Sequence, residues 1–292
     1  MKKPSVVALT MFRNESWVLG ASLRAALQWA DAVYAVDHGS TDDSLRIVSD
    51  VANEFPGRVA FEHLSAGLNW PEMLIRQSML DAARKKFNPT HFAIVDADEI
   101  LSTPSMKLVP EMLRAARPGQ TVALPQVAPY WSLDVRRVDG YFGESSQITL
   151  LFGDRPDLHW ANAADGYCFH HRQPKNSEAS PDFALPPWKS GGVIHLQYAS
   201  RARLAWKALW YKLVETTNFP GRKSADALNQ MYDWTLRSES TRLEGLPRSW
   251  FPIDPGTIDL AAEPWQATAA RAIVSAHGRD VLKGLTTHGL PI

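Results

Sequence analysis

The chain has 292 residues, and because 45% of them are hydrophobic, disorder along its whole length is excluded. Its 31 Lys and Arg residues balance 31 Asp and Glu residues, which argues against a dedicated nucleic-acid-binding protein. A single cysteine, Cys168, cannot build a disulfide framework or a cysteine-rich zinc site, and no stretch reaches the ~18 consecutive apolar residues of a membrane-spanning helix.

The first hundred residues alternate between short apolar segments, which favour strands, and amphipathic segments, which favour helices. Strands are predicted at residues 5–10, 32–36, 59–63 and 91–95, and helices at residues 17–30, 44–55 and 72–87. This order predicts a doubly wound, mostly parallel α/β sheet with helices on both faces.

The rest of the chain alternates less regularly. It is predicted to contain a helix at residues 106–117, strands at 122–127, 147–152 and 193–198, and an amphipathic helix at 201–217. Residues 173–192 are rich in Pro, Ser and Gly and are predicted to form a mobile loop over the site. From residue 224 onward the pattern is mainly helical, with Pro-rich connections.

Two carboxylates follow the predicted strand at residues 91–95. Asp96 and Asp98 stand where an open α/β sheet binds ligands, outside the carboxyl end of a strand. Both can face one cation if the chain leaves strand geometry there, and their oxygens suit Mg²⁺ or Mn²⁺, which would hold a diphosphate. An acidic turn that caps the next helix explains the same residues, so the motif alone leaves both interpretations open.

Polar residues also follow the first two predicted strands. Asp37 can accept hydrogen bonds from ribose hydroxyls or a base N–H, and Gly39 permits a close approach of the backbone, although a simple strand-to-helix turn is the alternative. Residues 10–15 (TMFRNE) bring a cation and a carboxylate to the same sheet edge. Here the alternative is that Asn14 caps the helix that follows and that Glu15 interacts favourably with the positive end of the dipole of that helix.

Together, the segments VVALTMFRNE, YAVDHGSTDDS and FAIVDADEI resemble glycosyltransferase family 2, and in particular its branch with R/K-N-E, D-x-G-S-T-D and D-A-D-E motifs. The resemblance covers residues 5–101. It implies the GT-A fold and an inverting, hexosyltransferase-like enzyme that takes a sugar from a UDP- or GDP-sugar and depends on Mn²⁺ or Mg²⁺. It further implies a GT-A catalytic domain at residues 1–200, with a nucleotide-sugar-binding half (1–101) and an acceptor half (102–200), followed by a helical extension at 201–292.

The resemblance also assigns roles to the residues at the strand ends. Asp37 matches the residue that holds the nucleoside, Glu15 the acidic residue near the base, Asp96 the one near the ribose and sugar, and Asp98 the metal ligand. Relatives often place a basic residue near the diphosphate before the fourth strand; Arg76 matches it, although a solvated arginine on a helix face is an equal alternative. The expected donor-binding set is Thr10, Arg13, Glu15, Asp37, Arg76 and Asp96.

Inverting transfer requires a general base, usually an Asp or Glu, to deprotonate the acceptor hydroxyl. Related enzymes place this residue after the strand predicted at 147–152, often in an H-E pair. This chain departs from that pattern: Asp165 is its best match, and Glu144 and Asp139 are the rivals.

One histidine is a candidate metal ligand. His195 matches an H-x-x-x-S element of the relatives and would complete the metal shell with Asp96 and Asp98, although a buried histidine with satisfied hydrogen bonds is an equal alternative. His170 and His171 are not expected to act as a ligand pair, because adjacent residues in a strand face opposite ways.

Two other classes of function remain as alternatives. A nucleotidyltransferase or other nucleotide-sugar-processing enzyme would show a glycine-rich phosphate loop after the first strand, whereas this chain has no glycine before Gly20. A non-catalytic carbohydrate-binding protein would not need clustered carboxylates, which repel each other. The expected acceptor is a glycan or lipid-linked glycan, and the expected location is the cytoplasm, with at most peripheral contact at the inner face of the membrane, for which the helix at 201–217 is one candidate.

Overall fold

The computed structural model of the chain describes residues 5–65, 72–143, 146–161, 171–236 and 241–292. Its first half contains the predicted alternation of strands and helices, namely β1 (Val6–Phe12), α1 (Leu19–Ala26), β2 (Ala32–His38), α2 (Ser44–Glu54), β3 (Val59–Leu64), α3 (Glu72–Phe87) and β4 (His91–Ile94). The strands lie in the order β3-β2-β1-β4, and all of these neighbours are parallel. The doubly wound α/β sheet expected from the sequence is therefore confirmed.

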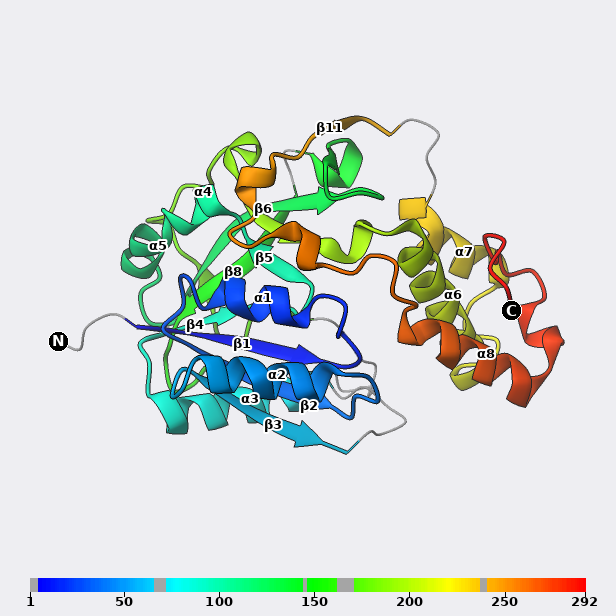
Figure 1. The fold of residues 1–292 in the computed structure, drawn as a ribbon, viewed down its shortest axis with the longest axis horizontal. Helices are drawn as coiled ribbons and strands as arrows, with labels where there is room; N and C mark the ends of the chain where they lie inside the picture. Colours follow the sequence, from blue (N-terminus) through cyan, green and yellow to red (C-terminus); the bar gives the residue numbers. More distant parts are fainter. Residues whose placement is uncertain (1–4, 66–71, 144–145, 162–170, 237–240) are drawn as a thin grey trace.

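Helices cover both faces of this parallel sheet (Figure 1). Along β1, Val6 and Ala8 pack into a core with α1 and α2, whereas Val7 and Leu9 pack into a second core with α3. The two cores follow from the strand geometry, in which successive side chains point to opposite faces. All seven residues of β1 are buried, as expected for a central strand covered on both sides.

The second half extends the sheet with mixed strand directions. It comprises β5 (Glu99–Leu101), α4 (Thr103–Met106), α5 (Val109–Ala115), β6 (Gln120–Pro129), β7 (Val135–Arg137), β8 (Gln147–Gly153), β9 (Glu178–Ala179) and β10 (Val193–His195). β8 runs antiparallel to both β4 and β6, so β6 points in the same direction as β4. The single helix predicted at 106–117 is two short helices, and Pro110 stands in the first turn of the second, where its missing N–H is tolerated.

Residues 173–192 are mostly irregular, as predicted, but the prediction that they lie over the site is wrong for the parts whose contacts are described. Glu178 pairs with Gln120, at the start of β6 and thus at the edge opposite to the carboxyl ends of the parallel strands. Further along, Gly192 donates its N–H to Ser102 Oγ. The segment follows the sheet because it pairs with the edge of β6, a contact that its irregular composition does not reveal.

The C-terminal part forms a helical unit beyond the carboxyl ends of the parallel strands (Figure 1). It contains α6 (Arg201–Asn218), α7 (Ala225–Asp233) and α8 (Trp265–His277), while β11 (Leu243–Gly245) between them pairs with β7. Residues after β11 return to the sheet, where Phe251 and Ile258 pack with Val18 of the segment leading into α1. Helix α6 was a candidate for contact with a membrane surface, but it buries Trp206 and Leu209 against the neighbouring helices.

Among the described residues, no helix combines the length and the apolar character needed to cross a bilayer.

Candidate functional site

The candidate site lies at the carboxyl ends of β1, β2 and β4. β1 is the central strand of the three: Phe12 pairs with Asp37 of β2, and Leu9 pairs with Ile94 of β4. Because these strands are parallel, the polar segments that follow them reach the same edge of the sheet. Arg13, Asp37 and the segment 96–99 are thereby brought to one edge.

The segments after β1 and β2 are tied together by hydrogen bonds. The Asn14 side chain, at a residue with φ of 57°, accepts a hydrogen bond from Thr41 N at 2.6 Å. In return, Ser40 Oγ accepts from Asn14 N and Ser44 Oγ accepts from Glu15 N, each at 2.8 Å. Asn14 therefore fastens two loops together rather than capping α1, which begins at Leu19.

Asp37, expected to hold the nucleoside, has a fully buried side chain. Its carboxylate accepts hydrogen bonds from Ser40 N at 3.1 Å and Ser40 Oγ at 2.5 Å, and it lies 2.7 Å from His63 Nδ1. The His63 side chain is 48% exposed. Asp37 thus shapes the loop after β2 and orients a histidine at the tip of β3.

Two polar atoms at the end of β1 are buried without a hydrogen-bond partner among the described residues. They are Thr10 Oγ1 and Arg13 Nε. Arg13 Cζ lies 5.4 Å from the ring centroid of Trp265, the first residue of α8. Buried polar groups in folded proteins nearly always have partners, so these two atoms leave hydrogen-bonding capacity unused at this end of β1.

Asp96 lies between two arginines. Arg76 donates to its Oδ1 at 3.2 Å and to Glu72 at 2.8 Å, while Arg172 donates to its Oδ2 at 3.1 Å. Arg172 also donates to Glu99 Oε2 at 2.5 Å. The Arg76 side chain is 4% exposed, so it is not the solvated helix-face arginine of the alternative interpretation. The Asp96 side chain is 34% exposed.

Asp98 faces a different partner, His195. His195 Nε2 lies 3.5 Å from Asp98 Oδ1, and both side chains are mostly buried. Burial by itself would raise the pKa of Asp98, but the nearby imidazole outweighs this effect and lowers it. Burial by itself would lower the pKa of His195, but the Asp98 carboxylate outweighs this effect and raises it. The Gln126 side-chain amide lies 2.8 Å from His195 Nδ1, the ring nitrogen that does not face Asp98, and so fixes the orientation of the ring. The pair comes together because β10 places His195 opposite Glu99 of β5.

Glu15 is the second buried carboxylate near Asp98. Burial, followed by the negative charge of Asp98, raises the pKa of Glu15 to about 7. Trp17 Nε1 donates a hydrogen bond to Glu15 Oε2 at 2.5 Å. Arg203 lies over the Trp17 ring, 4.0 Å from its centroid, and its positive charge partly offsets the rise. The site therefore contains an acidic group that changes charge near neutral pH.

Of the three candidates for the general base, the structure describes only Asp139. Asp165 and Glu144, the first two candidates for the general base, fall in segments that the structure does not describe. Asp139 is bound by Arg137, with 2.6 Å between Nε and Oδ1, and this hydrogen bond outweighs burial and lowers the pKa of the carboxyl.

The side chains present could bind a divalent cation only if a bound substrate supplied further oxygen ligands. In the described part of the chain, no group of three or more His, Cys, Asp and Glu side chains is placed to hold a metal ion. Asp98 and His195 offer one carboxylate and one imidazole, and both oxygens of Asp96 are engaged by arginines. Mg²⁺ is commonly held by one or two carboxylates together with substrate phosphates, so this pair fits a cation that arrives with a diphosphate.

Several residues of this corner stand outside any recognisable sequence motif. Arg172 has no motif around it, and its contact with Asp96 spans 76 positions of the chain. Gln126 likewise stands in an ordinary strand. For Lys207 and Arg203 of α6, both close enough to Asp98 to interact electrostatically, a signal did exist. Their spacing of four residues on one helix face, with Tyr211 four residues further, predicts a common direction.

Comparisons with known proteins found similar solved structures at low sequence identity and low TM-score. No protein-family model and no curated protein matches the sequence. The mannosyltransferase PcManGT from Pyrobaculum calidifontis, solved with GDP-Man and Mn²⁺, is similar over 94% of this chain and 75% of its own, with a TM-score of 0.39 and 15% identity. Glucosyl-3-phosphoglycerate synthase from Mycobacterium tuberculosis, solved with Mn²⁺, UDP and glucosyl-3-phosphoglycerate, is similar over 43% of this chain and 44% of its own, with a TM-score of 0.30 and 13% identity. The chain thus spans less than half of the second protein, and the chemistry of the corner rests on its own residues.

Proposed function

We propose that the protein is a metal-dependent, inverting glycosyltransferase that moves a sugar from a nucleoside-diphosphate sugar to a hydroxyl acceptor. The observation that carries this proposal is the Asp98–His195 pair, 3.5 Å apart at the carboxyl edge of the sheet. Two buried polar atoms without described partners, Thr10 Oγ1 and Arg13 Nε, are found at the end of the central strand β1. A cation ligand pair and unsatisfied hydrogen-bonding groups at one sheet edge suit a charged, polar donor.

Each of these residues has a defined task in this proposal. Asp98 and His195 would hold Mn²⁺ or Mg²⁺, which would supply positive charge beside the donor diphosphate. Arg76 and Arg172 fix the Asp96 carboxylate from two sides, so its exposed part can accept a hydrogen bond from a donor hydroxyl. The loop held by Asp37 forms the side of the site next to β2 and β3, where the nucleoside is expected.

The reaction is a single displacement. The acceptor oxygen forms a bond to the anomeric carbon on the face opposite the diphosphate. The bond between that carbon and the diphosphate oxygen breaks, and its electron pair leaves with the nucleoside diphosphate. The acceptor proton passes to a carboxylate, for which Asp165 remains the first proposal and Glu144 the second.

A run of aromatic rings supports a glycan as the acceptor. From the His195 ring, centroid separations of 5.7, 4.9 and 5.5 Å lead through Tyr198 and Phe142 to Trp234. Trp234 is 41% exposed and Tyr141 is 54% exposed, and the centroids of their rings lie 5.7 Å apart. Exposed aromatic rings present flat apolar faces with polar edges, which suits a sugar ring. A lipid-linked form of the glycan, a role in polysaccharide synthesis, and a cytoplasmic location at the inner membrane face stay predictions.

Nucleotide binding tests the proposal directly. UDP or GDP should raise the melting temperature in the presence of Mn²⁺ or Mg²⁺ and not in EDTA, because only the cation links the diphosphate to Asp98. Asp98→Asn should abolish the metal-dependent shift and sugar transfer, whereas Asp50→Asn, a change to an exposed α2 carboxylate, should alter neither. Full transfer by Asp98→Asn would refute its role at the metal.

The products separate this proposal from the two alternatives. A glycosyltransferase should release a nucleoside diphosphate from a panel of nucleotide sugars, detected by mass. A nucleotidyltransferase would form or consume pyrophosphate instead, and a carbohydrate-binding protein would leave the panel unchanged.

A further inference from the structure

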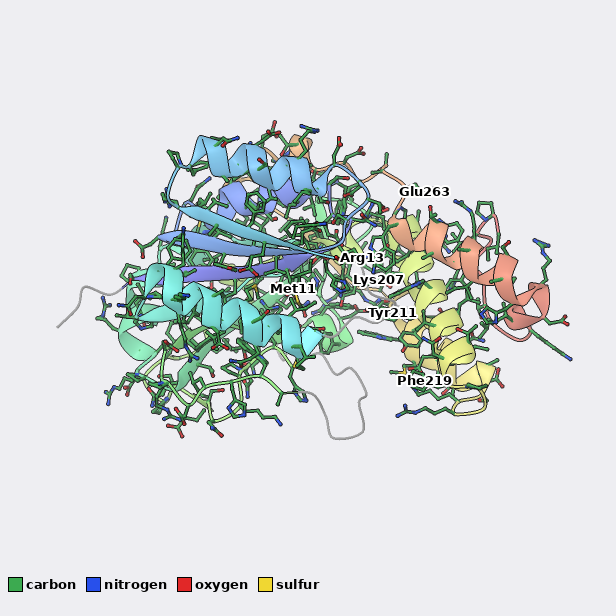
Figure 2. All side chains as sticks on the ribbon, turned by 90° about the horizontal axis from the view of Figure 1, so that it is seen from below. Met11, Arg13, Lys207, Tyr211, Phe219 and Glu263 are labelled. Carbon is green, nitrogen blue, oxygen red and sulfur yellow. The ribbon has the colours of Figure 1, made fainter. Side chains whose placement is uncertain are left out.

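Three positively charged side chains meet the carboxylates of the site from two ends of the chain. Arg13 follows β1, and Arg203 and Lys207 stand one turn apart on α6. Figure 2 shows Arg13 and Lys207 at the junction between the sheet and the helical unit. In the described part of the chain, none of the three forms an ion pair with a carboxylate within 4.0 Å, although Asp98 and Glu15 are close enough to Arg203 and Lys207 to interact with them electrostatically.

The hydrogen bonds that these cations form do not use all of their N–H donors. Lys207 Nζ makes one hydrogen bond among the described residues, to Gln197 Oε1 at 2.9 Å. An ammonium group has three donors, so two remain. Arg203 donates from one guanidinium nitrogen to the Ala262 carbonyl at 2.9 Å and lies over Trp17, and Arg13 Nε has no described partner.

Lys207 stays charged in this corner. Burial by itself lowers the pKa of Lys207, but the nearby Tyr211, Asp98 and Glu15 outweigh it and raise the pKa. Asp98 would also face a divalent metal ion, and the negative charge near Arg203 is shared among Glu15, Asp98, Asp259 and Asp42. The half-buried Lys207 ammonium therefore has donors that an added anion would satisfy.

We propose that Lys207 and Arg203 of α6, together with Arg13, form an anion-binding site that holds the diphosphate of the donor. The inference rests on the proposed function and adds to it: the helical unit would be part of the donor site. Lys207 would offset negative charge as the diphosphate leaves, from the side opposite the sheet.

Isothermal titration of the full chain with UDP and GDP, in Mn²⁺ and without acceptor, tests this site. Lys207→Met should weaken binding of the diphosphates by about tenfold or more, the loss expected for a charged hydrogen bond. It should weaken the nucleoside monophosphates less, because they lack the second phosphate. Lys207→Arg, which keeps the charge, should bind within about threefold of the wild type. Lys86→Met, the same change at an exposed position of α3, should have no effect.

The outcomes separate the two proposals. If the wild type binds no nucleoside diphosphate with metal, both fall. If the wild type binds but a folded Lys207→Met binds equally well, only the α6 site is overturned. Because the titration contains no acceptor, the loss would assign the site to the donor rather than to a phosphorylated acceptor. An equal loss in Lys207→Arg and Lys207→Met, with the fold intact by circular dichroism, would also contradict the proposed role of charge.

Discussion

Asp96 and Asp98 are two residues apart in the chain, yet the structure gives them different partners. Asp96 lies between Arg76 and Arg172, whereas Asp98 faces His195. The segment leaves strand geometry after Ile94, which frees the two side chains to point to different groups. The two carboxylates of the D-x-D motif are therefore not equivalent in this structure: Asp96 is held by arginines and Asp98 lies beside an imidazole.

At the residue scale, Glu15 makes a prediction about pH. Its pKa in the folded chain is raised from 4.5 to about 7, chiefly by burial, so folding favours the protonated form. The stability that this provides is fully present below pH 4.5 and is lost as the pH rises through 7. We expect Glu15→Gln to remove part of this decline, on the order of 2 kcal/mol between pH 4.5 and 7.5.

Urea unfolding in EDTA at several pH values would measure this effect. Glu54→Gln, a change to an exposed carboxylate paired with Arg24, serves as the control and should leave the pH dependence unchanged. Equal pH slopes for the wild type and Glu15→Gln would show that Glu15 titrates at an ordinary pKa.

At the element scale, α6 has two faces with different roles. One face carries Arg203 and Lys207 toward the site, and another carries Lys212 into the helical unit. Lys212 Nζ lies 2.7 Å from Asp233 of α7 and donates to the Thr286 carbonyl at 2.7 Å. The buried ion pair thus ties α6 to α7 and to the end of the chain, and sets the position of the helix that reaches the site.

Lys212→Met should therefore be strongly destabilising. The Lys212 side chain is completely buried and the Asp233 side chain is 4% exposed, so the change leaves a buried carboxylate that keeps only His288, 3.0 Å away, as a basic partner. The expected loss is about 3–5 kcal/mol, measured by chemical denaturation. The double variant Lys212→Met, Asp233→Asn should recover much of it. The exposed Lys283→Met should cost less than about 0.5 kcal/mol. A loss from Lys212→Met no larger than that of the control would show that the pair contributes little.

At the scale of the whole molecule, the helical unit and the sheet are built together. Residues after β11 return from the helices to the sheet, and Phe251 and Ile258 pack with Trp17 and Val18 in one core. The division at residue 200 stays a prediction, but this return path argues that the sheet half depends on residues beyond it.

A chain ending at residue 200 should accordingly fail to unfold cooperatively. The cut would remove Phe251 and Ile258 from the core beside α1 and Leu204 from the core around Tyr198, exposing large apolar surfaces. Circular dichroism during heating would measure this. A sharp transition near that of the full chain would show that residues 1–200 fold on their own and that the return segment contributes little.

The sequence by itself determined the parallel half of the sheet and the three polar strand ends. The apolar periods and turn residues between residues 5 and 101 are local signals, and parallel strands necessarily bring their carboxyl ends to one edge. The family resemblance already suggested that His195 would join Asp98, as it does in the structure. The tertiary structure alone decided which other distant residues meet there, namely Arg172 at Asp96 and Lys207 of α6 at the junction. It also decided that residues 178–179 pair with the first residues of β6, at the edge of the sheet opposite to the site. The physical reason is that such contacts join positions tens of residues apart, and no local pattern in either segment encodes its partner.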